Sequence, residues 1–382
     1  MDREHDPEFW WVGASAKLTA MPITLSRRQT LLGMGAAAIA PVAFWKREAV
    51  KPVGWAVLGI GSYATYQIMP AFKDCERSKL VALISGHPEK LSRFGDQYGI
   101  PTSNRYTYDT MDAIKNNPDI DVVYVITPPA THPDFTVRAA NLGKHVFSEK
   151  PMAPTVADCQ KMIDVCRKNH RLLGVGYRCH FENHNLRAIQ ACRSGELGKI
   201  SSMRSDHGFS IGRGQWRTER ALAGGGSMMD IGIYSLNALR YLSGEEPREV
   251  LATITNPPND DRFKDVEDTV DFKLTFPSGL IGHGTSGYSW QPGKNQYEVV
   301  GDRGTLFANP ATYYDSHRFT LNGRELDVKP NDQFATMMDA FSRCIREGGK
   351  FQAPGEEGRT DIRIIQAIYA SAASGKPVSF GR

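Results

Sequence analysis

Several absences narrow the class of protein. No basic tract is interleaved with aromatic residues, and the formal net charge is only +4 over 382 residues, so we expect no DNA or RNA partner. None of the six cysteines shows C-x-x-C spacing. Cys159 and Cys166 are seven positions apart on one predicted helix, a rise of roughly 10 Å that no disulfide can bridge. We therefore expect mostly buried, free thiols.

Metal-ligand spacing is also lacking. His180 and His184 are four residues apart, as a helical metal pair would be, but no third ligand of suitable spacing accompanies them. We therefore predict no metal site. Internal repeats and low-complexity tracts are absent as well.

No run near the N-terminus is long enough to span a bilayer comfortably. Leu31 to Phe44 is apolar but short, and it directly follows a twin arginine, Arg27-Arg28. This pattern is typical of a twin-arginine export leader, which we assign to residues 1–50, with Met21 as an alternative start. The expected location is the periplasm, with no membrane segment in the mature protein. The alternative interpretation is that the two arginines form the basic start of a helix that is buried in the fold.

A glycine-rich turn follows the first buried strand. Trp55–Leu58 is an apolar run, and Gly59, Gly61 and Ala64 complete the pattern G-x-G-x-x-A. The first glycine permits a tight turn, the second lets a pyrophosphate approach the backbone, and the small Ala64 lets helix and strand pack closely. The free N–H groups at the start of that helix would bind the phosphates. Alone, the pattern also fits a simple strand-to-helix turn.

The next strand supports a dinucleotide. Lys79–Ile84 is apolar and ends at Ser85-Gly86, about twenty residues after the glycines, where the adenosine ribose would lie. NAD enzymes commonly have a carboxylate at this position, whereas this chain has a hydroxyl and, just beyond, the ammonium of Lys90. We therefore predict NADP rather than NAD. The alternative interpretations are that Ser85-Gly86 is only a strand-ending turn and that Lys90 lies on a solvated helix face.

The order of the expected elements divides the chain in two. Alternating strands and helices over residues 51–177 predict an α/β Rossmann dinucleotide-binding domain. Over residues 178–382, hairpin turns at 276–279, 301–304 and 322–323 predict an α+β domain with a large, mostly antiparallel open sheet. Closing helices are expected at 332–346 and 360–373. One face of that sheet would stay bare, and a bare apolar face predicts a homodimer or homotetramer.

Seven motifs resemble one family. They are G-I-G-S-Y-A (59–64), S-G-H-P-E-K (85–90), E-K-P (149–151), G-Y-R-C-H (176–180), Q-W-R (215–217), G-G-G-S-M-M-D-I-G-I-Y (224–234) and P-G-E-E-G (354–358). The chain resembles the Gfo/Idh/MocA oxidoreductases from about Val53 to Phe380, and within them the glucose–fructose oxidoreductases. The resemblance implies that Lys150, Asp230 and Tyr234 are catalytic. Tyr234 ends the element D-x-G-x-Y (230–234). Most members of the family have histidine at this position, and tyrosine is typical of the glucose–fructose branch.

The chemistry of Tyr234 can be considered separately. Oxidising a sugar hydroxyl needs a hydride acceptor at the carbon and a proton acceptor at the oxygen. A free tyrosine has a pKa near 10, so Tyr234 needs a cation beside its phenolate, and we expect Lys150 to supply it. Asp230 lies one helical turn before Tyr234 and could hold a sugar hydroxyl or Lys150. The structural alternatives are that Tyr234 is a core tyrosine, that Lys150 is a surface lysine at a strand end, and that Asp230 only caps a helix.

Further binding residues follow from the strand ends and the motifs. The predicted cofactor contacts are Gly59, Gly61, Ser62, Tyr63, Ala64, Ser85, Gly86, Lys90, Thr127, Pro128, His132, Glu149, Lys150, Arg178, Trp216 and Arg217. The predicted substrate contacts are Lys150, Arg178, His180, Asp230 and Tyr234. Residues 224–226 are either an anion nest or a backbone approach to the substrate.

The expected function joins these points. A periplasm offers no obvious pool of NADP, so an exported enzyme would have to keep its cofactor. The resemblance implies oxidation of an aldose such as glucose to its lactone and reduction of fructose or another aldose to the alditol, with a tightly bound NADP serving both in ping-pong order. The alternatives are a dehydrogenase with exchangeable NADP, a glycoside hydrolase that retains NAD, and a non-catalytic sugar or dinucleotide sensor.

Overall fold

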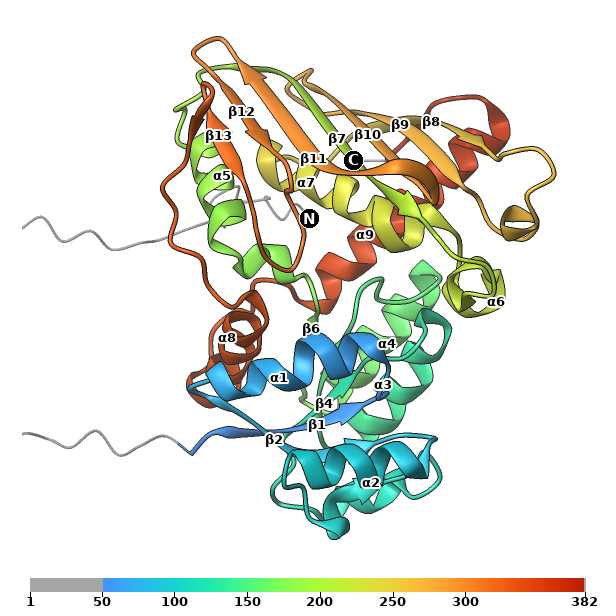
Figure 1. The fold of residues 1–382 in the computed structure, drawn as a ribbon, viewed down its shortest axis with the longest axis vertical. Helices are drawn as coiled ribbons and strands as arrows, with labels where there is room; N and C mark the ends of the chain where they lie inside the picture. Colours follow the sequence, from blue (N-terminus) through green and yellow to red (C-terminus); the bar gives the residue numbers. More distant parts are fainter. Residues whose placement is uncertain (1–50, 381–382) are drawn as a thin grey trace, which may run out of the picture. The chain divides into compact units, whose positions relative to one another are not determined.

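The computed structural model describes residues 51–380, which form two β-sheets with their helices (Figure 1). The predicted export leader, residues 1–50, lies outside the described residues. Among residues 51–380, no helix combines the length and the apolar character that a membrane span requires. The six cysteines are unpaired, and Cys159, Cys166, Cys192 and Cys344 are buried, as expected.

The first sheet has six strands in the order β3-β2-β1-β4-β5-β6, and the pairings are all parallel. Its strands are β1 (Val53–Leu58), β2 (Ser78–Ile84), β3 (Arg105–Tyr106), β4 (Val122–Val125), β5 (His145–Ser148) and β6 (Leu173–Val175). Every residue of β1 is buried, because the strand lies in the middle of the sheet with layers on both faces. The predicted Rossmann fold is confirmed.

Helices from both ends of the chain cover this sheet. The chain's first half contributes α1 (Met69–Ala71), α2 (Pro88–Gln97), α3 (His132–Asn141) and α4 (Val156–Lys168). Helix α8 (Gln333–Glu347) comes from the second half and lies beside α1 (Figure 1). The indole N–H of Trp55 donates to Ser342 on α8 at 3.0 Å, and Phe341 packs against Phe147. The first sheet is therefore completed by a helix that follows the second sheet in sequence.

The second sheet has nine strands in the order β14-β13-β12-β11-β7-β10-β9-β8-β15. They are β7 (Ile200–Ser210), β8 (Glu249–Thr255), β9 (Thr269–Thr275), β10 (Ile281–Gly287), β11 (Ser289–Gly301), β12 (Thr305–Ala308), β13 (Phe319–Leu321), β14 (Arg324–Glu325) and β15 (Val378–Ser379). Within residues 51–380, β7 and β10 form the single parallel pair of this sheet, so the predicted, mostly antiparallel sheet is confirmed.

Helices lie against one face of the second sheet (Figure 1). They are α5 (Asn183–Arg193), α7 (Ile233–Ser243) and α9 (Gly355–Ser374), and the short α6 (Arg220–Ala223) lies near the edge. Helix α9 begins five residues before the expected Thr360, because Pro354 precedes a first turn with two glutamates, Glu356 and Glu357.

Polar side chains lie on the opposite face of the second sheet, around β7, β10 and β11. Asp206 on β7 pairs with Arg204 at 3.0 Å and accepts hydrogen bonds from Thr285 at 2.7 Å and Gln296 at 3.2 Å. These groups satisfy one another on the face that points away from α7. Apolar burial is therefore not expected around Asp206, and the homodimer or homotetramer through this sheet stays a prediction.

Candidate functional site

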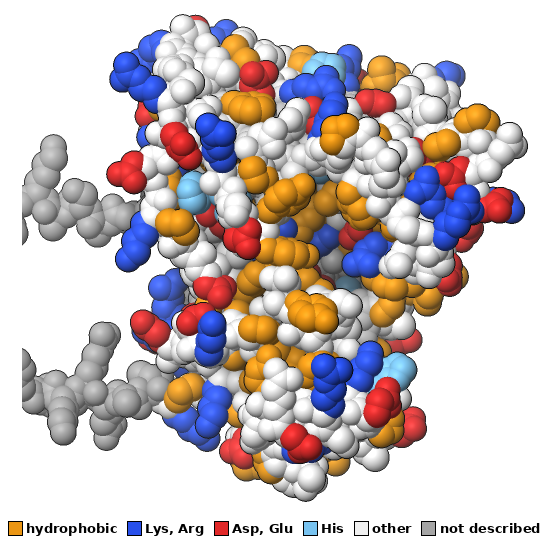
Figure 2. Space-filling view, viewed as in Figure 1, with side chains coloured by type: hydrophobic (Ala, Val, Ile, Leu, Met, Phe, Trp, Pro, Cys, Tyr) orange, Lys and Arg blue, Asp and Glu red, His pale blue; other side chains and the backbone are white. Residues whose placement is uncertain are grey.

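A cavity of about 1000 Å³ lies where the ends of the first sheet's strands meet the second half of the chain. Figure 2 shows it as a hollow bordered by apolar side chains. The first half contributes residues 61–64, 126–129 and 149–151 to its walls. The second half contributes Arg178, residues 209–212, residues 215–217, residues 229–231, Tyr234 and residues 312–315. This size suits a large organic ligand.

The glycine turn has the shape that a pyrophosphate needs. Gly59 has φ +95°, and a Cβ there would lie 2.5 Å from the carbonyl oxygen of Ile126, so only glycine fits. A Cβ on Gly61 would meet nothing within 4 Å, which leaves its backbone open to the cavity. The helical segment that contains Ala64 begins directly after it. The residues present therefore fit a dinucleotide.

The predicted cofactor contacts fall into two groups. Those that line the cavity are Gly61, Ser62, Tyr63, Ala64, Thr127, Pro128, Glu149, Lys150, Arg178, Trp216 and Arg217. Those that do not are Gly59, Ser85, Gly86, Lys90 and His132.

The residues outside the cavity have identifiable local roles. The Ser85 hydroxyl is buried and accepts a hydrogen bond from the backbone N–H of His87, as expected of a strand-ending turn. Lys90 reaches back to the glycine turn and donates to the carbonyl oxygen of Ile60 at 3.1 Å. The prediction that His132 contacts the cofactor was wrong: its ring is fully buried between the carbonyl oxygens of Thr127 and Met152 and joins two loops.

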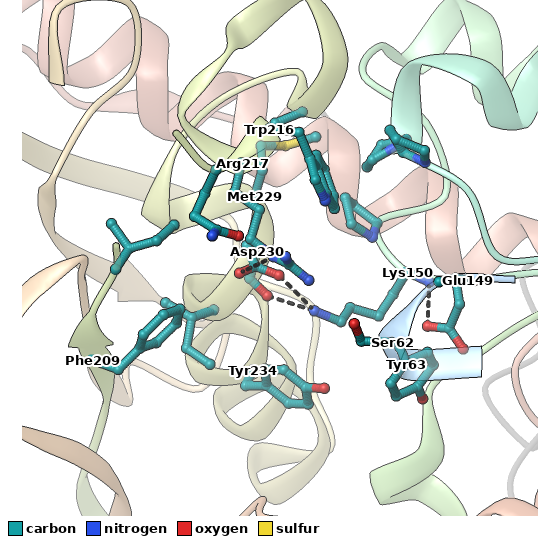
Figure 3. Close-up of a pocket in the computed structure, with 18 of the residues that line it drawn as sticks. Ser62, Tyr63, Glu149, Lys150, Phe209, Trp216, Arg217, Met229, Asp230 and Tyr234 are labelled. Carbon is teal, nitrogen blue, oxygen red and sulfur yellow. Dashed lines mark hydrogen bonds and ion pairs between the residues drawn. The ribbon is translucent and has the colours of Figure 1, made fainter. Parts of the chain in front are cut away.

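The three predicted catalytic side chains lie on one wall of the cavity (Figure 3). The Lys150 ammonium donates to the Asp230 backbone carbonyl at 2.6 Å and lies 3.4 Å from its carboxylate. The Tyr234 ring lies beneath them, with its hydroxyl directed to the side of Ser62 and Tyr63. A π-helical segment, Met228–Gly232, presents Asp230, and α7 continues from it and presents Tyr234.

The cation at the Tyr234 hydroxyl differs from the expected one. Lys150 does not reach this oxygen; its ammonium lies over the ring face, 4.7 Å from the centroid, because Asp230 holds it there. Arg178 donates to the hydroxyl at 3.1 Å instead. Burial raises the pKa of Tyr234 well above its usual value, and Arg178 opposes that rise. The expectation that Lys150 makes this phenol acidic is therefore corrected.

Asp230 is an ionised anchor at the centre of the wall. Burial alone would raise the pKa of its carboxyl, but Lys150 and Arg217 outweigh burial and the pKa is lowered. Arg217 lies 3.1 Å from the carboxylate, and the hydroxyl of Tyr288 donates to it at 2.9 Å. Arg217 also stacks on Trp216, with its guanidinium 4.5 Å from the ring centroid. Sequence reasoning missed Tyr288, because a tyrosine inside a strand pattern carries no functional signal.

His180 lies behind the site instead of in it, so its predicted contact with substrate was wrong. Its ring is buried, lies between the rings of Tyr177 and Tyr241, and pairs with the side chain of Asn237 on α7. Burial lowers the pKa of His180 to about 3. The neutral ring joins the segment that carries Arg178 to the helix that carries Tyr234.

The glycine run at 224–226 is an anion nest, but its anion comes from the protein. The buried Glu267 carboxylate accepts from the backbone N–H of Gly226 at 2.8 Å and of Met228 at 3.1 Å. A Cβ on Gly226 would lie 2.1 Å from the carbonyl oxygen of Glu267, so the approach requires glycine. This carboxylate fixes the start of the segment that presents Asp230.

The two histidines of the sequence pair are not neighbours in a common cluster, but one of them meets two other potential ligands. His184 meets Glu182 and His317, and their potential ligand atoms all lie within 4.8 Å of one another, whereas His180 is elsewhere. The Glu182 oxygens already accept from the backbone N–H groups of His184 and Asn185 at the start of α5, at 2.9 and 2.8 Å. These bonds explain the carboxylate as a helix cap.

The fold and this wall together define a class of protein. A dinucleotide cradle opens into the same cavity as a phenol, an ammonium and a carboxylate, which are groups that can hold and move a proton at a substrate oxygen. This is the site of a nicotinamide-dependent oxidoreductase.

Family models identify the particular family. The model described as "Oxidoreductase family, NAD-binding Rossmann fold" (GFO_IDH_MocA) matches residues 53–177, and the "GFO/IDH/MocA C-terminal domain" matches residues 185–307. The chain therefore belongs to the Gfo/Idh/MocA oxidoreductase family, as the motifs predicted.

Three relatives illustrate the similarity. The crystal structure of an aldose-aldose oxidoreductase from Caulobacter crescentus, in complex with glycerol, is 49% identical, covers 86% of this chain and 100% of its own, and has a TM-score of 0.84. D-xylose 1-dehydrogenase [NADP(+)] of Haloarcula marismortui is 28% identical, over 86% of this chain and 94% of its own. 1,5-anhydro-D-fructose reductase of Ensifer adhaerens is 28% identical, over 84% of this chain and 97% of its own.

Proposed function

We propose that this protein is an exported, NADP-dependent sugar oxidoreductase that retains its cofactor. It oxidises an aldose such as glucose to the lactone and reduces fructose or another aldose to the alditol. The observation that carries the proposal is the meeting of Lys150, Asp230 and Tyr234 on one wall of the cavity into which the glycine turn opens. The 49% identical aldose-aldose oxidoreductase supports the choice of sugar as substrate.

The residues of this wall have different roles in the proposed reaction. When bound, the dinucleotide supplies the hydride acceptor. Tyr234, as the phenolate, takes the proton of the C1 hydroxyl while C1–H breaks and C1=O forms, so that one proton and one hydride leave the aldose. Asp230 and the Lys150 ammonium orient the sugar hydroxyls. In the second half-reaction, the Tyr234 hydroxyl returns the proton to the carbonyl oxygen of the second sugar, which becomes an alcohol.

Retention of the cofactor follows from the proposed export. Outside the cytoplasm no pool of NADP is at hand, and a protein that released its nucleotide would turn over once. A second sugar that reoxidises the bound nucleotide removes this difficulty. The twin-arginine route, which carries folded proteins, allows the cofactor to be acquired before export. This export signal lies in residues 1–50, outside the described part of the chain.

The proposal predicts a two-step absorbance change without added nucleotide. The purified protein is expected to contain NADP after dialysis. Addition of glucose alone should raise the absorbance of reduced nicotinamide, to at most one equivalent per chain, and fructose added afterwards should lower it again. If glucose has no effect until free NADP is supplied, and NADPH then accumulates in solution, the protein is a dehydrogenase with an exchangeable cofactor.

Lys90 provides a test of the preference for NADP. Its ammonium lies at the glycine turn, 3.1 Å from the Ile60 carbonyl oxygen, beside the expected position of the ribose. Lys90→Ala is expected to weaken NADP relative to NAD by about 10- to 100-fold, because a hydrogen bond to a charged group contributes about 1.5–3 kcal/mol. The measurement is the ratio of the two nucleotides taken up on reconstitution. Lys90→Arg should keep the preference, and equal ratios in both variants would contradict this role.

A further inference from the structure

We propose that Arg178 is the cation that stabilises the Tyr234 phenolate, and that its charge is free for this task because neutral oxygens alone hold it. This inference rests on the proposed function, in which Tyr234 exchanges the proton with the sugar. It assigns to an arginine from the short helical turn after β6 the role that the lysine of the E-K-P motif was expected to have.

Arg178 is anchored by four oxygens. One terminal nitrogen donates to the Tyr313 carbonyl at 3.0 Å and to the Gln333 side-chain carbonyl at 2.8 Å. The other donates to the Thr312 carbonyl and, at 3.1 Å, to the Tyr234 hydroxyl. The guanidinium is therefore fixed in direction, and the hydroxyl of Tyr234 is one of its four acceptors.

The anchoring loop is itself fixed by the second sheet. Asn295 on β11 accepts from the backbone N–H groups of Ala311 and Thr312 at 2.8 and 2.6 Å, and its amide donates to the Thr312 hydroxyl at 2.9 Å. These bonds hold the Thr312 and Tyr313 carbonyls against the guanidinium. Asn295 is buried, so the arrangement does not depend on mobile surface groups.

Among residues 51–380, no carboxylate forms an ion pair or hydrogen bond with Arg178, and Glu149 acts on it only from a longer distance, although Arg178 is only 4% exposed. Burying a cation in this way is costly unless it meets a negative charge at some stage of the cycle. Lys150 differs, because the Asp230 carboxylate already lies 3.4 Å from its ammonium. A phenolate at Tyr234 would neutralise Arg178, whereas it would add a second anion beside Lys150.

The other ionisable groups around Tyr234 do not replace Arg178. Those that face it are Tyr63, Tyr124, Glu149, Lys150, Cys179, His207 and Tyr314. Glu149 and Cys179 raise the pKa of Tyr234. His207 stacks on the ring with centroids 5.9 Å apart, and burial lowers its pKa to about 3, so it is neutral at the pH of the reaction. Arg178 is the group that opposes the effect of burial most strongly.

Two pairs of variants test the proposal. Gln333→Glu places a carboxylate on the guanidinium, and Gln333→Met removes the same amide without adding charge. Arg178→Lys keeps a cation, and Arg178→Met removes it. For each, the rate of sugar oxidation is measured against pH, and the Tyr234 hydroxyl is titrated by the difference in tyrosinate absorbance between each variant and its Tyr234→Phe counterpart.

We expect Gln333→Glu and Arg178→Met to raise the apparent pKa of Tyr234 by about 1–3 units, since that is the effect of an opposite charge at this distance. At neutral pH, kcat should then fall about 10- to 1000-fold, with a smaller change in KM. Gln333→Met and Arg178→Lys should keep the pKa close to that of the unmodified protein.

Two results would overturn the proposal. One is an unchanged Tyr234 pKa in Gln333→Glu or in Arg178→Met. The other is an equal loss in the charged and uncharged member of each pair, which is what a purely structural role predicts. The titration requires no turnover, so it tests Arg178 even if no sugar is oxidised, and failure of the proposed function remains distinguishable. If Arg178→Met does not fold, the Gln333 pair decides.

Discussion

Replacing Tyr234 with phenylalanine is expected to lower kcat for sugar oxidation by about 10²- to 10⁴-fold, the usual contribution of general acid–base catalysis. The substitution removes only the hydroxyl. The ring keeps its contacts with His207 at 5.9 Å and with the Lys150 ammonium at 4.7 Å, so the wall of the cavity should stay intact. The loss should appear in both half-reactions, because the same oxygen takes the proton from one sugar and returns it to the next.

The measurement is kcat for each half-reaction, together with the amount of nucleotide bound per chain. Bound nucleotide should be unchanged, since the predicted phosphate contacts lie at the glycine turn. Tyr66→Phe is the matched control: this tyrosine is 75% exposed and lies outside the cavity, and its variant should turn over normally. If Tyr234→Phe retained more than a tenth of the activity, another group would be the proton acceptor.

The fold could be predicted largely because local patterns agreed with the tertiary structure. The apolar run at Trp55–Leu58, Gly59 with its positive φ and the hairpin turns each specify one geometry. Two features were not encoded locally. Helix α8 covers the first sheet through Trp55 and Ser342, a contact that no pattern in the sequence indicates. The polar cluster on the second sheet depends on which cross-strand neighbours meet around Asp206.

The candidate site shows the same division. The residues in the motifs were found, since the first sheet's strand ends and α7 bring Lys150, Asp230 and Tyr234 to one cavity. Which cation pairs with which acceptor could not be predicted. The distances from the three cations (Lys150, Arg178 and Arg217) to the Asp230 carboxylate and the Tyr234 hydroxyl depend on tertiary packing. Arg178 reaches the Tyr234 hydroxyl only because the carbonyls of a distant loop hold it, and Lys150 is drawn instead to Asp230. Glu267 carried no signal at all.

Among the variants proposed for this protein, truncation of Glu267 is expected to lower the free energy of unfolding most. Glu267→Ala should lower the free energy of unfolding by at least about 3 kcal/mol, because it leaves three donors without an acceptor, each costing about 1–3 kcal/mol where it is buried. They are the backbone N–H groups of Gly226 and Met228 and, at 2.8 Å, the hydroxyl of Tyr369. Urea unfolding measures the change, with the same load of bound nucleotide in every sample, because ligand binding adds to apparent stability.

Tyr369→Phe separates the two parts of this cluster. It removes one donor and leaves the carboxylate with both backbone N–H groups, so we expect a loss of about 1–2 kcal/mol. Activity should distinguish the variants further. Gly226 and Met228 begin the segment that presents Asp230, so Glu267→Ala should also lower kcat in the protein that remains folded, whereas Tyr369→Phe should not. Equal stability losses in both would mean that the backbone N–H groups find other acceptors, and that the glycine run does not depend on this carboxylate.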